Sequence, residues 1–235
     1  MKRFSLPFLI LVLLALACGT SDLPPLIGGG TPEPTAVPIS PDELLTYRVP
    51  LYTISLSAGE TVPGTQLQYV GKAGDVYQVK IDGLATNKRG GDSFAWRGIV
   101  APGVLTSYNL RLGTELLGEL PAAGTVEVMV LNPTPIAIDV SLLPNRPADY
   151  SNILTSHVVP LQGMIPGTTL QFLGVVNGQA QIGGRTGYPY LAVADSLDWV
   201  GKLRENVILR YTLRVTRIDV AELRLDGTVE LWIIQ

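Results

Sequence analysis

Apolar and polar residues alternate with a period of two along several short stretches of this chain. In residues 104–112, VLTSYNLRL, every second position is apolar or threonine, and residues 207–215, VILRYTLRV, repeat the alternation with Arg210, Thr212 and Arg214 between apolar neighbours. This period is typical of a strand in an antiparallel sheet with one buried face. Long helical periodicity is absent, and Gly (25) and Pro (18) are frequent, as expected for many turns. The pattern predicts an all-β fold.

The same pattern occurs twice, at a fixed distance along the chain. VPGTQLQYVG begins at Val62 and IPGTTLQFLG at Ile165, 103 residues later, and GDSFAWRG and ADSLDWVG keep that offset. The offset holds without a gap over about 70 positions, of which about 30% are identical, as expected of a duplicated unit. We therefore expect two tandem homologous small antiparallel β-barrel or sandwich domains. They comprise residues 47–143 and 153–235, joined by a linker at 144–152.

The repeated residues have structural interpretations. Pro63-Gly64 and Pro166-Gly167 fit the centre of a type II turn, in which Pro presets φ and Gly accepts a positive φ. Asp92 and Asp195 are expected to accept backbone N–H groups in turns. Asp226-Gly227, with Ala123-Gly124 as its counterpart, is interpreted as a hairpin turn.

Two Arg–Glu pairs also recur at the same offset. Arg111 with Glu127, and Arg214 with Glu230, fall on the more polar faces of strands that we expect to be adjacent. A cross-strand ion pair at a surface contributes only about 0–1 kcal/mol. The alternative is a shared polar groove.

The N-terminus has the composition of a secretory signal. Lys2 and Arg3 precede an apolar run from Leu6 to Ala17, which is shorter than the roughly 20 residues that span a bilayer as a helix. The run ends in Leu14-Ala15-Leu16-Ala17-Cys18, and this resembles the lipobox of bacterial lipoproteins. The resemblance covers about the first 20 residues. It implies a signal peptide at 1–17 and lipid attachment at Cys18, although Ala15 stands where Leu is commonest.

The residues that follow form a Pro- and Gly-rich segment. Residues 18–46 contain several prolines and the triplet Gly28-Gly29-Gly30, which favour extended and flexible backbone. We expect a lipidated Cys18 followed by a disordered tether. This tether either spaces a domain from the membrane or is a disordered leader without a role in spacing.

Composition excludes some classes of function. The formal net charge is −3 and no basic cluster occurs, which argues against nucleic acid as a partner. The single Cys excludes a disulfide within the chain, and the single His, His157, is expected to be a linker or surface residue. Asp195 and Asp198 are three residues apart, but Ala95 replaces the second in the other copy, so no metal site is supported. No cofactor is expected.

Gly91-Asp92-Ser93-Phe94 raises the question of a catalytic serine. These four residues resemble the nucleophile block of GDSL-type esterases, a family that also needs a His near its end, three residues after an Asp. No Asp precedes His157 at that spacing, and Ala194 replaces the glycine in the second copy. Without a general base the Ser93 hydroxyl stays an ordinary alcohol. We interpret the segment as scaffold, and no catalytic residue is assigned.

Aromatic residues are the remaining candidates for a ligand site. Trp96 and Trp199 recur at the 103-residue offset, and Tyr188 and Tyr190 flank Pro189. If exposed in one groove, these rings suit stacking on a sugar or peptide. If buried, each tryptophan anchors a core.

The sequence as a whole predicts a non-catalytic protein, lipid-anchored outside the cytoplasm to a bacterial membrane, that binds a partner or has a structural role at the cell envelope. It is similar in appearance to uncharacterised bacterial surface lipoproteins. Its expected partners are the membrane, through the N-terminal lipid, and an envelope protein or polysaccharide. One alternative is a carbohydrate- or peptidoglycan-binding module, and a second is a hydrolase.

Overall fold

The computed structural model describes residues 43–234, which lie within one compact unit, residues 39–235. The expected signal peptide, Cys18 and the tether up to residue 42 lie outside the described residues. The described part is all-β and contains no α-helix, as the alternation predicts. No helix in residues 43–234 has the length and apolar character required to span a bilayer.

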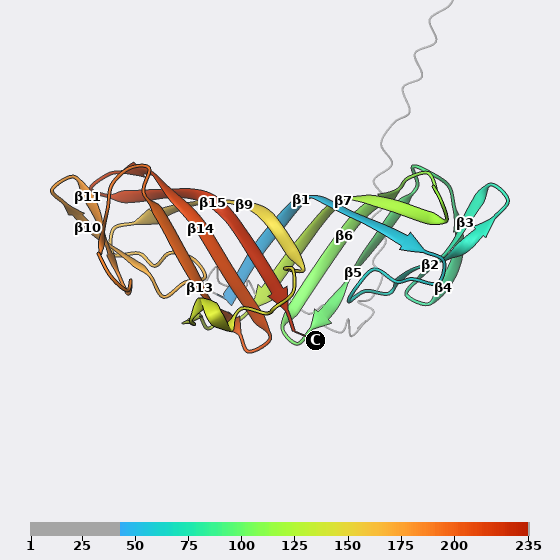
Figure 1. Cartoon of the computed structure of the whole chain (residues 1–235), viewed down its shortest axis with the longest axis horizontal. Helices are drawn as coiled ribbons and strands as arrows, with labels where there is room; N and C mark the ends of the chain where they lie inside the picture. Colours follow the sequence, from blue (N-terminus) through green and yellow to red (C-terminus); the bar gives the residue numbers. More distant parts are fainter. Residues whose placement is uncertain (1–42, 235) are drawn as a thin grey trace, which may run out of the picture. The chain divides into compact units, whose positions relative to one another are not determined.

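The first large sheet is built from the N-terminal half (Figure 1). In spatial order it contains β1 (Leu44–Ser57), β7 (Glu119–Leu131), β6 (Val104–Leu112) and β5 (Ser93–Ala101). All neighbours are antiparallel. The alternating positions of β6 are buried as the sequence predicts, because every second residue of a strand faces the same side of its sheet.

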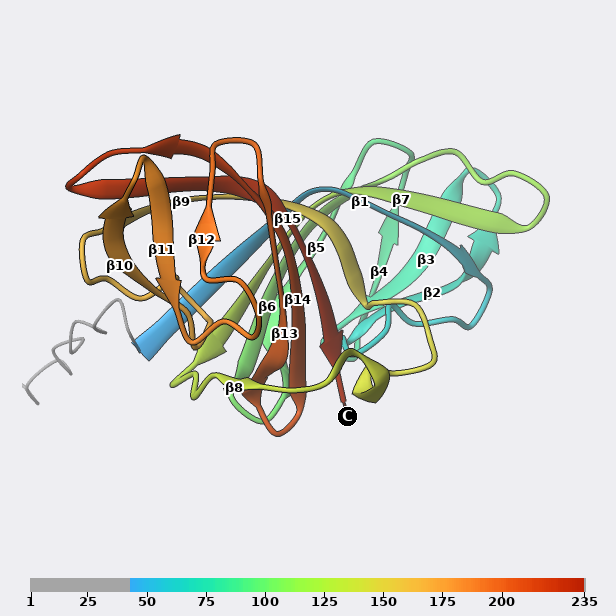
Figure 2. The same cartoon turned by 60° about the vertical axis from the view of Figure 1, so that its left-hand side comes forward.

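The second large sheet is built mainly from the C-terminal half (Figure 2). It contains β8 (Ile136–Ala137), β13 (Ser196–Arg204), β14 (Val207–Ile218), β15 (Glu222–Ile233) and β9 (Tyr150–Pro160). β14 shows the same alternation as β6, with its odd-numbered residues from Val207 to Val215 buried. A 3₁₀ helix, η2 (Val140–Leu142), lies between β8 and β9 in the sequence.

Two small sheets complete the described fold. One contains β2 (Leu67–Ala73), β3 (Val76–Ile81) and β4 (Leu84–Lys88), and the other contains β10 (Gln171–Val176), β11 (Gln179–Gly183) and β12 (Tyr190–Leu191). Each follows a Pro-Gly turn, where Gly64 and Gly167 have φ values of 72° and 73°. The N–H of Thr65 bonds the carbonyl of Val62, and that of Thr168 bonds the carbonyl of Ile165, both at 3.1 Å, which confirms the predicted turns. No sheet in residues 43–234 closes into a barrel, so the barrel form of the expectation is not observed.

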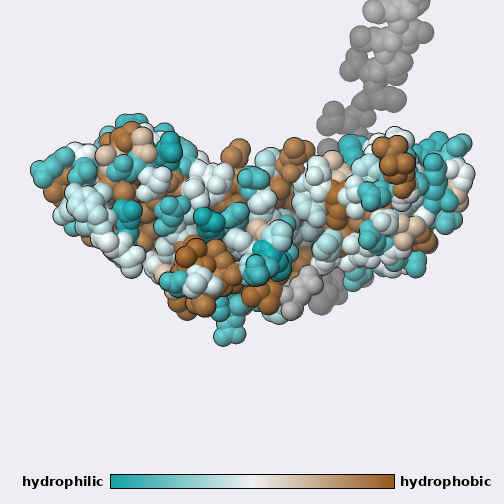
Figure 3. Space-filling view, in the orientation of Figure 1, coloured by the Kyte–Doolittle hydropathy of each residue, from teal (hydrophilic) through white to brown (hydrophobic). Residues whose placement is uncertain are grey.

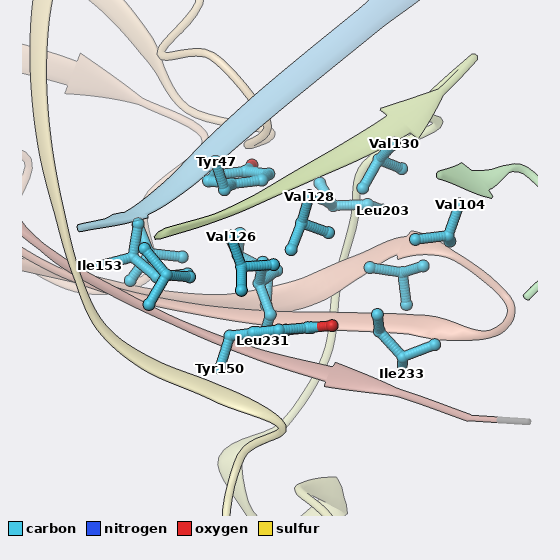
Figure 4. Close-up of a cluster of buried hydrophobic side chains, with 14 of the residues drawn as sticks. Tyr47, Val104, Val126, Val128, Val130, Tyr150, Ile153, Leu203, Leu231 and Ile233 are labelled. Carbon is cyan, nitrogen blue, oxygen red and sulfur yellow. The ribbon is translucent and has the colours of Figure 1, made fainter. Parts of the chain in front are cut away.

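The hydrophobic core is continuous between the two halves. Figure 4 shows Val126 and Val128 of β7 gathered with Ile153 and Leu231 of the second large sheet. The residues 144–152, expected as a linker, do not separate two cores, and β9 already begins at Tyr150. The structure therefore describes one body in residues 43–234.

The expected hairpin turn at Asp226-Gly227 is wrong. Both residues lie inside the continuous strand β15, where Asp226 is opposite Arg214 and Gly227 is opposite Leu213. A Cβ on Gly227 would clash with the carbonyl oxygen of Thr212, so glycine is needed there because two strands approach closely. Gly124 has the same role in β7, where a Cβ would clash with the carbonyl of Asn109.

The expected cross-strand pairs Arg111–Glu127 and Arg214–Glu230 are also wrong, because the register is shifted by four residues. Glu127 is opposite Ser107, and Glu230 is opposite Arg210, with which it forms an exposed ion pair at 3.6 Å. The Arg111 side chain instead donates to the carbonyl of Gly91 at 3.0 Å.

Candidate functional site

The turn before Ser93 is a scaffold element. Asp92 Oδ2 accepts the backbone N–H of Arg89 at 2.8 Å, and Asp195 Oδ2 accepts that of Ala192 at the same distance, which confirms the predicted role of both carboxylates. Ser93 is the exposed first residue of β5, opposite Arg111. His157 lies on β9, in the other large sheet. The structure therefore does not bring a histidine to Ser93.

His157 is half-buried in β9, opposite Leu225. Its Nε2 lies 3.0 Å from the hydroxyl of Thr155, and its ring packs edge-on against Tyr211 at 5.6 Å. Burial lowers the pKa of His157, and the nearby carboxylate of Asp226 partly opposes this effect. The imidazole thus favours its neutral form inside the sheet, and this residue lies in a strand and not in a linker.

Both recurring tryptophans are packed as core residues, with exposed fractions of 8% for Trp96 and 6% for Trp199. The indole N–H of Trp96 donates to Asp82 Oδ1 at 2.7 Å, and that of Trp199 faces Thr169 Oγ1 at 3.2 Å. Each ring lies over the glycine two residues later, Gly98 or Gly201, where a Cβ would clash with the ring. The Trp-x-Gly sequence is thus explained by a ring that lies flat along its own strand.

One of these aromatic rings, that of Trp199, lines a groove on the second large sheet. We call it the Trp199 groove, and its volume is about 590 Å³. Its walls come from β8 and η2, from the loop after β11, and from β13 and β14: Ala137, Ile138, Asp139, Val140, Leu170, Gly184, Arg185, Thr186, Asp198, Trp199, Val200 and Arg210. It therefore combines one aromatic ring with side chains of both charges.

The charged residues of the Trp199 groove are held by local contacts. Arg185 donates to the carbonyl of Tyr188 at 2.8 Å, which fixes the loop that forms one wall. Asp139 Oδ1 accepts the backbone N–H of Ser141 at 2.8 Å, and hydrogen bonds from the Ser141 side chain and then from this N–H lower the pKa of the Asp139 carboxyl. Asp198 is exposed beside them. Such a surface can donate and accept hydrogen bonds from a polar ligand.

Tyr188 and Tyr190 follow that same loop. Tyr188 is 66% exposed and Tyr190 is half-buried, and their rings meet edge-on with centroids 5.5 Å apart. The structure thus places the loop of these two tyrosines next to Trp199 and leaves Trp96 in the other large sheet. Ligand binding by any of the four residues stays a prediction.

A second cavity, which the sequence analysis missed, contains three tyrosines. Its volume is about 100 Å³, and Tyr52, Tyr108, Tyr150 and Asp149 line it together with Ile233 and a Pro-Gly turn. The hydroxyl oxygens of Tyr108 and Tyr150 are 2.6 Å apart. Burial, and then the neighbouring hydroxyl and carboxylate groups, raise the pKa of Tyr108 far above its usual value. The sequence contains one signal of this contact: Tyr108 lies 103 residues before Tyr211, and Tyr150 lies 103 residues after Tyr47.

Exposed apolar side chains gather near the groove. Ile136, Val140 and Leu142 are 62%, 60% and 65% exposed, and Figure 3 shows a hydrophobic group over η2. In residues 43–234, no group of three or more His, Cys, Asp or Glu side chains is placed to hold a metal ion. No protein-family model, curated protein or solved structure matches this chain.

Proposed function

We propose that this chain is a lipid-anchored extracytoplasmic protein with a non-catalytic binding or structural role at a bacterial cell envelope. The observation that carries the proposal is the Leu14–Cys18 junction, which places the single cysteine of the chain where lipoproteins are lipidated. Two or more acyl chains hold a protein stably on a membrane, whereas one binds marginally. The partners are the membrane, through this lipid, and an envelope protein or polysaccharide.

We further propose that the body arose by duplication of one β unit. The turns of Asp92 and Asp195, the two Pro-Gly turns and the close-approach glycines recur with matching hydrogen bonds. These features support two homologous halves that share one core.

A binding role fits the described residues better than hydrolysis. The single histidine, His157, lies in the other large sheet from Ser93, and its hydrogen-bond partner is a threonine hydroxyl within its own strand. Nucleophilic catalysis needs a nucleophile, its base and a cleft for substrate in one place. The Trp199 groove supplies a surface for recognition instead.

The alternative is a carbohydrate- or peptidoglycan-binding module, and the Trp199 groove favours it. The arginine and aspartate side chains of its walls suit the hydroxyl groups of a sugar, whereas the Trp199 ring is packed as a core residue and offers no open face for stacking. The test is sedimentation of the protein with purified peptidoglycan and with neutral polysaccharides. Arg210→Ala, inside the groove, should reduce binding, and Arg111→Ala, in the other sheet, serves as its control. Equal binding by both variants would show that the groove is not the site of polysaccharide binding.

The anchoring proposal is tested by membrane fractionation of intact cells that express the wild type or Cys18→Ala. Thr20→Ala, two residues away, is the matched control. The wild type and Thr20→Ala should fractionate with membranes, and Cys18→Ala should lose stable attachment. Crosslinking before lysis then captures the neighbours of the wild type. A Cys18→Ala protein that stays fully membrane-bound would refute lipid anchoring.

A further inference from the structure

The edge of the second large sheet carries a short extra strand. β8 runs antiparallel along β13, with Ala137 opposite Gly201 and Ile136 opposite Lys202. The N–H of Ile138 donates to the carbonyl of Val200 at 3.1 Å. The N–H of Thr134 donates to the carbonyl of Leu203 at 2.7 Å. Alternate residues of 134–138 therefore direct their N–H groups at β13, and Pro135 falls between them, where the lack of an N–H costs nothing.

β5 is the matching edge of the first large sheet. Ser93 is opposite Arg111 just as Ser196 is opposite Arg214, so β5 and β13 have the same register against their inner neighbours. Both strands also have an irregularity one residue before their ends, after Ile99 in β5 and after Lys202 in β13. The backbone of the two edges is therefore built in the same way.

This equivalence identifies the groups that β5 presents on its outer side. Arg97 and Val100 stand where β13 has Val200 and Leu203, whose carbonyls accept the bonds from the β8 segment. Among residues 43–234, β5 pairs with β6 alone. An edge strand with unpaired N–H and C=O groups is a template for another strand.

A glycine at the same place in each edge provides the second observation. A Cβ on Gly201 would lie 2.6 Å from the carbonyl oxygen of Ile136, so glycine there allows the β8 backbone to approach. Gly98 occupies the equivalent position of β5, and the three atoms nearest to its Cβ position all belong to the Trp96 ring. Both edge strands thus carry a glycine at the position where β8 approaches β13.

We propose that the β5 edge, from Arg97 to Val100, binds an extended polypeptide strand in antiparallel pairing. The strand has the chemistry of residues 134–138, a Thr-Pro step followed by alternating apolar and small residues. Main-chain hydrogen bonds to the edge give the affinity, and Gly98, like Gly201 on the other edge, allows a partner backbone to approach closely. The inference names the class of partner for the binding role proposed above. It does not depend on lipid attachment at Cys18.

The probe is a fluorescent peptide with the sequence of residues 132–139, titrated into the full-length chain. Fluorescence anisotropy should show saturable binding, and hydrogen exchange should show that the peptide slows exchange of the Arg97 and Ile99 amides. Slower exchange along β13 alone would place the peptide at the β8 position, and it would overturn the proposal.

A proline in β5 tests the proposed contact while it keeps the backbone hydrogen bonds between β5 and β6. Arg97→Pro deletes an outward N–H, whereas Arg97→Ala removes the side chain and keeps that N–H. Arg97→Pro should weaken peptide binding about tenfold or more, and Arg97→Ala should bind within about twofold of the wild type. Equal binding by both variants contradicts the proposal.

Modified peptides provide a test that leaves the protein unchanged. N-methylation at the peptide position of Ile138 removes a bonding N–H and should abolish measurable binding. N-methylation at the position of Ala137, whose N–H points away from the edge, should leave binding nearly unchanged. If both peptides bind equally, or if the chain forms a dimer that Arg97→Pro breaks and the peptide does not affect, the peptide proposal is overturned.

Discussion

The hydroxyl oxygens of Tyr108 and Tyr150 lie 2.6 Å apart, and they join the centre of the first large sheet to the outer strand of the second. Tyr211 and Tyr47, which are displaced from them by 103 residues, repeat the contact with the roles of the sheets exchanged, at 3.4 Å. In each half, the tyrosine of a central strand thus contacts the tyrosine on the first strand of the other half. This reciprocity is the form of contact made by two subunits about a two-fold axis.

The shorter of these two contacts should contribute more to stability. Tyr108→Phe leaves the buried Tyr150 hydroxyl without this partner, and we expect a loss of about 1–3 kcal/mol in the free energy of unfolding. Tyr47→Phe should cost less, because the Tyr211 hydroxyl keeps its bond to the carbonyl of Pro166 at 3.1 Å. Urea denaturation of both variants measures the difference. Equal losses would contradict this ranking of the two contacts.

Ala194 is a strained residue, and replacing it should stabilise the protein. Its φ is 75°, in the left-handed region, where its counterpart Gly91 has a φ of 88°. Ala194→Gly should raise the free energy of unfolding by up to about 1 kcal/mol, and Gly91→Ala should lower it by about 1 kcal/mol. A Cβ at Gly91 meets no atom within 4 Å, so backbone strain alone acts there. Thermal denaturation that shows the opposite signs would exclude this explanation.

Gly227→Ala distinguishes a strand interior from a hairpin turn. In the observed strand the new methyl group clashes with the backbone of β14, so we expect a loss of several kcal/mol or failure to fold. At a turn glycine the same change costs only about 1 kcal/mol. Ala123→Ser, at an exposed position of β7, is a mild control. A Gly227→Ala variant as stable as this control would argue against the β14–β15 register.

The lowered pKa of His157 makes folding stability depend on pH. The folded protein holds His157 neutral, so the unfolded chain binds the proton more readily. The His157 contribution is complete above the unfolded pKa of about 6.5, and it is lost as pH falls below that value toward the folded pKa. His157→Gln should flatten the decline in stability between pH 7 and 5, as measured by urea denaturation at each pH. An unchanged profile in this variant would show that other groups cause the decline.

Local structure was predictable because it depends on local chemistry. Val207 to Val215 alternate with polar residues, and Pro63-Gly64 carries the φ preferences of its turn, so both followed from neighbouring residues. Asp92 was recognisable as a turn carboxylate for the same reason. These features need no information about distant parts of the chain.

The failures involve contacts between distant segments. Asp226-Gly227 has the composition of a hairpin turn, but the glycine is required by the backbone of Thr212, which lies across the sheet. The Trp199 groove has walls from β8, β14 and the loop after β11, and no local pattern shows that these segments meet. The Tyr108–Tyr150 contact likewise depends on how the two large sheets pack.

The most direct test of the proposed function is the mass of the N-terminal peptide from membrane-extracted protein after proteolysis. The account predicts a peptide that begins at Cys18 and carries covalently bound acyl chains. A peptide that begins at Met1, or one that contains Cys18 as a free thiol within a longer segment, would contradict it.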